Sequence, residues 1–152
     1  MRTVQDILQS KNVVNNSIDA STTVFDALTQ LKNVDLSYLV VKDGEQFAGI
    51  FSERDYSRKV ILEGRSSKAS TVKEVMSTDL PKVQLTDTLE QCIHQLLQNK
   101  TRYLLAFNGN QTFAGVITIH DLLRQIIANK EASFDHAAVK QLLDHDESGR
   151  IY

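Results

Sequence analysis

The chain of 152 residues contains one cysteine, one proline and no tryptophan. Because Cys92 is the only cysteine, the chain can form neither an internal disulfide nor a CxxC metal site, and we predict no metal. The stretch MRTVQDILQS at residues 1–10 has no apolar run of signal-peptide length, and no stretch reaches the length of a membrane span. These absences predict a protein of the reducing cytoplasm with no membrane partner.

A surplus of basic residues is also missing. The chain has 17 Lys and Arg against 19 Asp and Glu, so its formal net charge is −2. Non-specific binding to nucleic acid needs a basic surplus, and we therefore predict no nucleic-acid partner. The hydrophobic share of 41% is enough for the core of one domain or of two closely packed small ones.

What the chain does contain is a repeat. The phrase FAGIFSERD occupies residues 47–55, and FAGVITIHD occupies residues 113–121. Upstream of the two phrases, VFDALTQLKNVDLSYLVV (24–41) aligns with LEQCIHQLLQNKTRYLLA (89–106), and TVQDIL (3–8) aligns with TVKEVM (71–76). The chain is therefore predicted to contain two copies of one unit.

Each copy carries the same series of elements. A short helix comes first, then a short strand, an amphipathic helix with apolar residues at i, i+3, i+4 and i+7, two strands joined by a tight turn with Asp-Gly or Asn-Gly, and a final helix. The unit is thus predicted to be β-α-β-β-α, an α/β (α+β) fold. The predicted short and final helices are residues 4–8 and 53–62 in the first copy, and 72–76 and 119–128 in the second.

The predicted divisions of the chain follow the repeat. The first copy is residues 1–66, the second is residues 67–128, and a tail without a repeat is residues 129–152. The stretch EGRSSKAST (63–71) is small and polar, and it is interpreted as the linker at the boundary. In the tail, apolar residues recur with helical spacing, which predicts a C-terminal helix; they are Phe134, Ala138, Val139, Leu142 and Leu143.

The repeated phrase supports two interpretations. A hydroxyl residue followed three places on by an acid, at a strand-to-helix turn, is typical of a helix cap: Ser52 with Asp55, and Thr118 with Asp121. The same pair at a helix N-terminus is also suited to a nucleotide, because a carboxylate accepts two ribose hydroxyls and free N–H groups attract phosphate. In that second interpretation, Gly49 and Gly115 leave room for a flat ring.

The repeat resembles the CBS domain, and two copies in tandem resemble a Bateman module. The resemblance rests on GIFSERD and GVITIHD, and it is particularly close to small stand-alone CBS-pair proteins. It implies two β-α-β-β-α repeats packed with pseudo-twofold symmetry, with clefts that bind AMP, ADP, ATP, NAD(H) or S-adenosylmethionine. It also implies a homodimer. Many members have a proline in the strands that match YLVV and YLLA, and this chain has none there.

The resemblance also implies roles for particular residues. Asp55 and Asp121 would hold ribose hydroxyls, and Ser52 and Thr118 would touch ribose or phosphate. The remaining residues expected at the nucleotide are those that line or flank the adenine ring and those that contact phosphate: Ser17, Tyr38, Lys82, Tyr103, Arg54, Arg58, Arg102 and His120. Arginine suits the phosphate role because its fork of donors matches phosphate oxygens.

Three functions remain open from the sequence. The preferred hypothesis is a non-catalytic regulatory module that senses an adenine nucleotide and acts through a homodimer or a separate effector protein. The first alternative is a nucleotide-processing enzyme that uses Asp121 and His120 as acid and base. The second is a structural dimerisation adaptor without ligand, whose motifs are only helix caps.

Overall fold

The computed structural model describes residues 2–11, 16–34, 36–109, 111–128, 137, 140–142 and 144. The chain divides into two compact units, which we treat separately. The continuous unit is Val13–Asp79, and the segmented unit combines Met1–Asn12 with Leu80–Tyr152. Each unit contains a three-stranded sheet and helices, so the predicted α+β class is confirmed.

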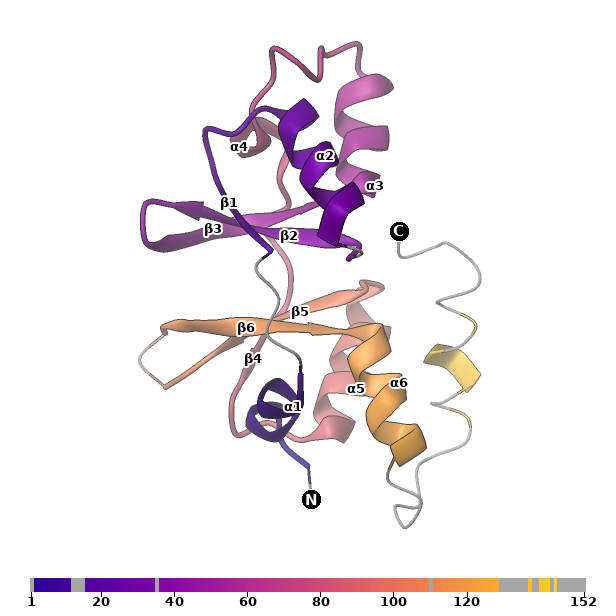
Figure 1. Ribbon diagram of the computed structural model, residues 1–152. Helices are drawn as coiled ribbons and strands as arrows, with labels where there is room; N and C mark the ends of the chain where they lie inside the picture. Colours follow the sequence, from indigo (N-terminus) through magenta and orange to yellow (C-terminus); the bar gives the residue numbers. More distant parts are fainter. Residues whose placement is uncertain are drawn as a thin grey trace. The chain divides into compact units, whose positions relative to one another are not determined.

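The continuous unit has a sheet of order β1-β2-β3, in which β1 is parallel and β3 antiparallel to β2. Helices α2 and α3 lie on the same face of this sheet (Figure 1). The turn between β2 and β3 contains Gly44 at φ +64°, a conformation that glycine adopts without strain. The elements are β1 (Ser17–Asp19), α2 (Val24–Val34), β2 (Tyr38–Asp43), β3 (Gln46–Ser52), α3 (Glu53–Tyr56), the π-helix η1 (Ser57–Ile61) and α4 (Val72–Val75).

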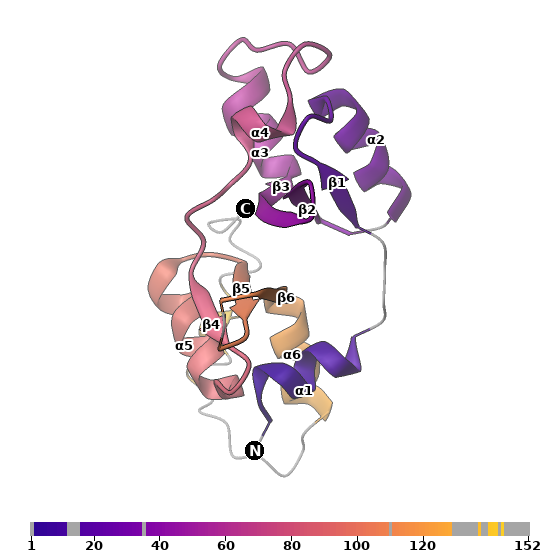
Figure 2. The same cartoon turned by 90° about the vertical axis from the view of Figure 1, so that its left-hand side faces the viewer.

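The segmented unit repeats this plan with a sheet of order β4-β5-β6. Helices α5 and α6 lie on one face of the sheet (Figures 1 and 2). Its elements are α1 (Val4–Ser10), β4 (Lys82–Gln84), α5 (Leu89–Asn99), β5 (Tyr103–Phe107), β6 (Phe113–Thr118) and α6 (Ile119–Ala128). The predicted β-α-β-β-α order is therefore present in both units.

The short helices are exchanged between the two sequence repeats. Helix α1 belongs to the first repeat but lies in the segmented unit, where the Val4 N–H donates to the Asp87 carbonyl at 2.9 Å. Helix α4 belongs to the second repeat but lies in the continuous unit, where Ile50 and Ser77 exchange backbone hydrogen bonds of 3.0 and 2.8 Å. The compact units thus do not coincide with the division at residue 66.

The stretch 63–71 does not separate the compact units either, because it lies wholly inside the continuous unit. Its carbonyls accept the first N–H groups of α2: Phe25 N–H bonds Ser67 O at 2.8 Å, and Val24 N–H bonds Ser70 O at 2.9 Å. These N–H groups have no partner within their own helix. The polar segment that was interpreted as a linker therefore caps α2.

The motif glycines make room for the exchanged helices. A Cβ built on Gly115 would lie 2.9 Å from Leu8 Cδ2, and one on Gly49 would lie 2.8 Å from the Ser77 carbonyl oxygen and 2.9 Å from Met76 Sδ. Real Cβ atoms do not approach so closely. The space expected for a flat ring is occupied by the ends of α1 and α4, and that expectation is corrected.

Each unit has its own apolar core. In the segmented unit, α1 contributes Val4 and Ile7, both fully buried, and the tail contributes the fully buried Leu142. The described tail residues, 137, 140–142 and 144, are helical. The other apolar residues of the predicted C-terminal helix lie outside the described residues: Phe134, Ala138, Val139 and Leu143.

Candidate functional site

In the continuous unit, the repeated motif forms a helix start with a buried carboxylate. Ser52 is the last residue of β3 and the N-cap of α3. Asp55 Oδ2 accepts the Ser52 backbone N–H at 2.9 Å, and Ser52 Oγ accepts the Asp55 N–H at 3.4 Å. This reciprocal pair is a capping box, which fixes the orientation of the carboxylate.

The second oxygen of Asp55 meets groups from elsewhere in the unit. Ser77 Oγ donates to Asp55 Oδ1 at 2.8 Å, and Lys59 Nζ lies 3.0 Å from the same oxygen. The Lys59 ammonium also donates to the Val75 carbonyl at 3.1 Å. A buried charge needs such partners, because desolvation without them is costly. Lys59 is therefore the counter-ion of Asp55.

In the segmented unit, the motif forms the same helix start. Asp121 Oδ2 accepts the Thr118 backbone N–H at 2.9 Å, and Thr118 Oγ1 accepts the Asp121 N–H at 3.2 Å. Both side chains are buried. The capping interpretation is thus realised in both units, and the two carboxylates are held by the backbone of their own helix starts.

Asp121 also has two cations beside it. Lys11, which follows α1, places Nζ 2.8 Å from Asp121 Oδ2 and donates to the Val116 carbonyl at 2.9 Å. Arg124, one turn along α6, pairs with Asp121 Oδ1. The Arg124 side chain is 68% exposed, compared with 24% for Lys11. We call each aspartate, with its capping hydroxyl and its cations, a motif corner: among the described residues, two cations contact the carboxylate at Asp121, and one does so at Asp55.

The chemistry available at each corner follows from these contacts. The carboxylate oxygens can accept hydroxyl groups, and the neighbouring ammonium and guanidinium groups can bind phosphate. The carboxylate is fixed by backbone N–H groups, whereas its cations sit on long side chains that reach solvent. Each carboxylate is therefore a fixed acceptor, whereas the position of each cation depends on a flexible side chain.

The two predicted tyrosines lie beside the motif hydroxyls. Tyr38 is the cross-strand partner of Ser52, and Tyr103 is the partner of Thr118. Tyr38 is buried, while Tyr103 is half-buried. Antiparallel partners have neighbouring Cβ atoms, so each tyrosine begins its strand next to the motif corner of its own unit.

The predicted flanking residues behave differently from the tyrosines. Ser17 is the register partner of Val40, and Lys82 is the partner of Leu105. The Lys82 ammonium lies over the Phe107 ring, 5.2 Å from its centroid. Phe107 ends the strand that Tyr103 begins, so this contact directs Lys82 away from the motif corner.

The structure brings two of the predicted basic residues together. Arg102 Nη2 lies 3.4 Å from His120 Nε2, and the Arg102 carbonyl accepts the Ile119 N–H at 3.0 Å. The Arg102 side chain is buried and His120 is exposed. In the continuous unit, Arg54 is half-buried in α3 and Arg58 is exposed in η1. His120 contacts Arg102, whereas Asp121 contacts Lys11 and Arg124.

Four residues at the corners were not predicted as site residues: Lys11, Lys59, Ser77 and Arg124. A signal existed for two of them, because Lys59 and Arg124 follow their aspartates by four and three positions and face them on a helix. Lys11 and Ser77 lie just after the exchanged helices α1 and α4, and no local spacing in the sequence predicts their contacts with the aspartates.

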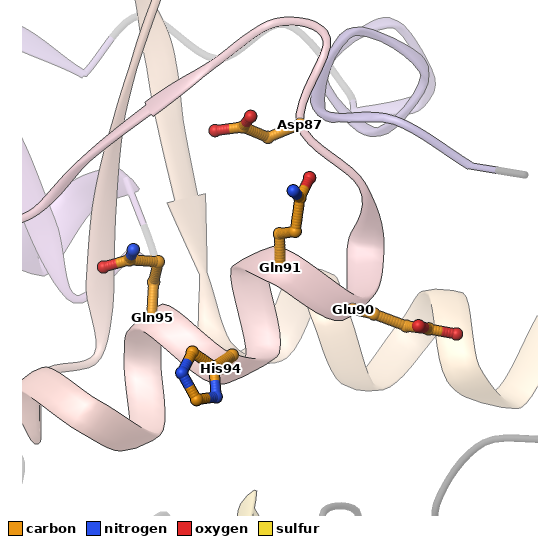
Figure 3. Close-up of a pocket in the computed structure, with 5 residues that line it drawn as sticks. All are labelled: Asp87, Glu90, Gln91, His94 and Gln95. Atoms are coloured by element: carbon orange, nitrogen blue, oxygen red, sulfur yellow. The ribbon is translucent and has the colours of Figure 1, made fainter.

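One open groove of about 460 Å³ lies along α5 in the segmented unit, lined by residues outside the motif (Figure 3). The lining residues are Asp87, Glu90, Gln91, His94 and Gln95. Among the described residues, no three His, Cys, Asp or Glu side chains are grouped to hold a metal ion. Helices that are long and apolar enough to cross a bilayer are also absent from the described part of the chain.

The single cysteine of the chain, which lies on α5, packs in the core of the segmented unit. Cys92 is fully buried. Burial raises the pKa of the Cys92 thiol to about 12, and the nearby Asp87 charge acts in the same direction. The thiolate is the reactive form of cysteine, so burial and the raised pKa both disfavour a nucleophilic role for Cys92.

The fold and the motif corners define a tandem pair of β-α-β-β-α units, each with an aspartate held at the start of its last helix. The sequence model of the CBS domain family matches residues 4–61 and 72–128 of this chain. The chain belongs to the CBS domain family, and it carries two copies of the domain.

The relatives agree with this assignment. The chain is 31% identical over 137 residues to the CBS domain-containing protein CBSX3, mitochondrial, of Arabidopsis thaliana, with 82% of this chain covered. It spans 65% of the length of that relative. A solved protein with CBS domains from Burkholderia ambifaria MC40-6 is 31% identical, with a TM-score of 0.76 and coverage of 88% of this chain and 100% of that one. CBSX2, whose crystal structure is in complex with AMP, is 26% identical to this chain, with a TM-score of 0.64. The match covers 85% of this chain and 98% of that one.

Proposed function

We propose that this protein is a non-catalytic regulatory module that binds an adenosine-containing ligand, such as AMP, ADP, ATP or NAD(H), at its motif corners. The observation that carries the proposal is the same in both units: a buried aspartate, fixed by its own helix start, has a cationic side chain against its carboxylate. Such a pair offers an acceptor for ribose hydroxyls and a donor for phosphate in one place.

The roles within each corner follow from this proposal. Asp55 and Asp121 accept ribose hydroxyls, and Ser52 and Thr118 support them. Tyr38 and Tyr103, at the strand starts, line the adenine side, which Ser17 flanks from the neighbouring strand. Lys82, whose ammonium lies over the Phe107 ring, is left out of the proposed site. Phosphate is bound by the basic groups near each motif: Arg54, Arg58, Arg102 and His120.

The relative in complex with AMP supports this ligand class. CBSX2 is a protein of the same fold with 26% identity, and its structure was solved with AMP. Ligand binding changes the output only if the ligand has different affinities for two states of the protein. We propose that this output passes through a homodimer or a separate effector protein, in the cytoplasm.

A second candidate is a structural adaptor without ligand. One observation favours it: the capping box and the ion pairs already engage both aspartates. In that case the carboxylates serve only the helix starts, and the motif recurs because both units need the same strand-to-helix turn.

Calorimetric titration separates the two candidates. We expect the whole chain to bind at least one of AMP, ADP, ATP, NADH and S-adenosylmethionine with a Kd between about 1 µM and 1 mM, on the order of 4 to 8 kcal/mol. Asp55→Asn and Asp121→Asn should each weaken binding at their corner by roughly tenfold or more, because a charged hydrogen bond contributes about 1.5–3 kcal/mol. No heat with any of these ligands at millimolar concentration would refute the sensor.

The matched control is Asp26→Asn, an exposed acid in the first turn of α2, outside the motif. It should leave the Kd unchanged. The thermal midpoint of each variant should be recorded as well, because the motif asparagines lose the ion pairs of Lys59 and of Lys11. Wild-type affinity in both motif variants, with a lowered midpoint, would favour the adaptor.

A further inference from the structure

A lysine ammonium bridges the motif aspartate and a backbone carbonyl in each unit. Lys59 Nζ lies 3.0 Å from Asp55 Oδ1 and 3.1 Å from the Val75 carbonyl oxygen. Lys11 Nζ lies 2.8 Å from Asp121 Oδ2 and 2.9 Å from the Val116 carbonyl oxygen. The two ammonium groups thus make the same pair of contacts, one charged and one to the main chain.

The two lysines do not occupy corresponding places in the repeat. Lys59 lies on the last helix of its copy, and the residue that aligns with it in the second copy is Gln125. Lys11 follows the first helix, and the alignment of 3–8 with 71–76 places Asp79 opposite it. The repeat alone therefore does not account for the lysines, and the same contact is reached from two different sequence positions.

The contacts leave little room for a ligand at the carboxylates. A carboxylate offers about four acceptor positions on its two oxygens. At Asp121, the Thr118 N–H, Lys11 and Arg124 already use three of them. At Asp55, the Ser52 backbone N–H, the Ser52 hydroxyl, Ser77 and Lys59 use all four. A vicinal diol needs two acceptor positions, so it must displace a group that is already bound.

The lysines are the groups that a diol can displace from the carboxylates. The capping N–H belongs to the helix start and cannot leave, whereas an ammonium on a flexible four-carbon chain can move to solvent or to phosphate. We propose that Lys11 and Lys59 are internal competitors for the ribose site, and that they set the affinity of each corner for ligands with vicinal hydroxyls. The inference rests on the proposed function.

A phosphate group on the ligand lowers the free-energy cost of displacing the lysine. An ammonium that leaves the carboxylate can pair with a phosphate oxygen of the same ligand, so its displacement is partly compensated for a nucleotide. A neutral nucleoside offers no such compensation. The lysines therefore discriminate against adenosine and in favour of AMP.

The test compares Lys11→Met and Lys59→Met with the wild type by calorimetric titration of adenosine, 2′-deoxyadenosine and AMP. We expect each variant to bind adenosine roughly 3- to 30-fold more tightly, the range given by the strength of partly exposed ion pairs and charged hydrogen bonds. The gain should be smaller for AMP and absent for 2′-deoxyadenosine, which lacks one hydroxyl of the diol. Lys73→Met is the matched control, because Lys73 is exposed on α4, and it should change no affinity.

The outcomes separate the inference from the proposed function. If the wild type binds AMP but neither variant gains affinity for adenosine, the lysines are structural bridges and the inference is overturned alone. If neither the wild type nor any variant binds AMP or adenosine, the proposed function fails and the inference falls with it. Should the methionine variants not fold, Lys11→Gln and Lys59→Gln keep a donor for the carbonyl and remove the charge, and the same gain is expected of them.

Discussion

At the scale of single residues, the glycine of the motif shows how one pattern can have two explanations. Gly49 and Gly115 precede the motif hydroxyls by three positions, and this spacing suited a ligand ring as well as a close chain approach. The structure gives the second explanation, because the ends of α4 and α1 occupy the space where a Cβ would stand. The identity of the neighbour was not contained in the spacing, since it comes from a distant segment.

Alanine substitutions at three glycines test this explanation. Gly49→Ala should lower the stability most, by about 1–3 kcal/mol, because its Cβ would meet a backbone carbonyl that cannot move freely. Gly115→Ala should cost less, since the methyl end of Leu8 can shift. Gly109→Ala is the control, with no atom within 4 Å of the added Cβ. The urea midpoints report the order, and equal midpoints for the three variants would contradict the close approach.

At the scale of elements, the sequence predicted the existence and type of the helices and strands well, and their boundaries less well. The final helix of the first copy was expected as one helix from 53 to 62, but it continues from α3 as the π-helix η1, in which the Leu62 N–H bonds the Ser57 carbonyl at 3.3 Å. Such single turns are rare and carry no simple sequence signature. The cation that pairs with the aspartate also differs between the two last helices: Lys59 at i+4 pairs with Asp55, whereas Arg124 at i+3 pairs with Asp121.

The capping box of α1 gives a prediction for acid pH. Asp6 accepts the Thr3 backbone N–H at 3.0 Å and the Thr3 hydroxyl at 3.1 Å, and these hydrogen bonds lower the pKa of Asp6 below its ordinary 3.8. Because the folded-state pKa is the lower one, the box stabilises α1 above pH 3.8 and loses this effect as the pH falls through the folded-state value.

A carboxyl NMR titration of Asp6 should show the lowered pKa. In Thr3→Ala the hydroxyl donor is lost and the backbone donor stays, so the pKa should rise part of the way towards the ordinary value. An Asp6 that titrates at its ordinary pKa in the wild type would show that the box is not formed in solution.

At the scale of the whole molecule, the notable feature is the exchange of the short helices. Helix α1 buries Val4 and Ile7 in the core that α5, β5, β6 and α6 form, although most of the first repeat lies in the other unit. Helix α4 likewise buries Val72 and Val75 in the core of the continuous unit. Each sequence repeat therefore contributes to the stability of both cores.

Amide hydrogen exchange can show which compact unit each short helix stabilises. Ile7→Ala should lower stability by roughly 2–5 kcal/mol and speed amide exchange in β5 and β6, because the cavity opens in the segmented unit. Val72→Ala, the matched variant on α4, should cost less and speed exchange in β2 and β3. If Ile7→Ala acted on β2 and β3 instead, α1 would belong with its own sequence repeat.

The sequence by itself determined the doubled unit, its order of elements, the capping pairs at the last helices and the family. These follow from local periodicity, turn chemistry and a repeated nine-residue motif, each of which involves only residues that are close together in the sequence. The tertiary structure alone decided which unit receives each short helix, what fills the space beside the glycines and which lysine lies on each aspartate. Those contacts join residues as far apart as Lys11 and Asp121, and no local pattern fixes which distant side chain meets a buried charge.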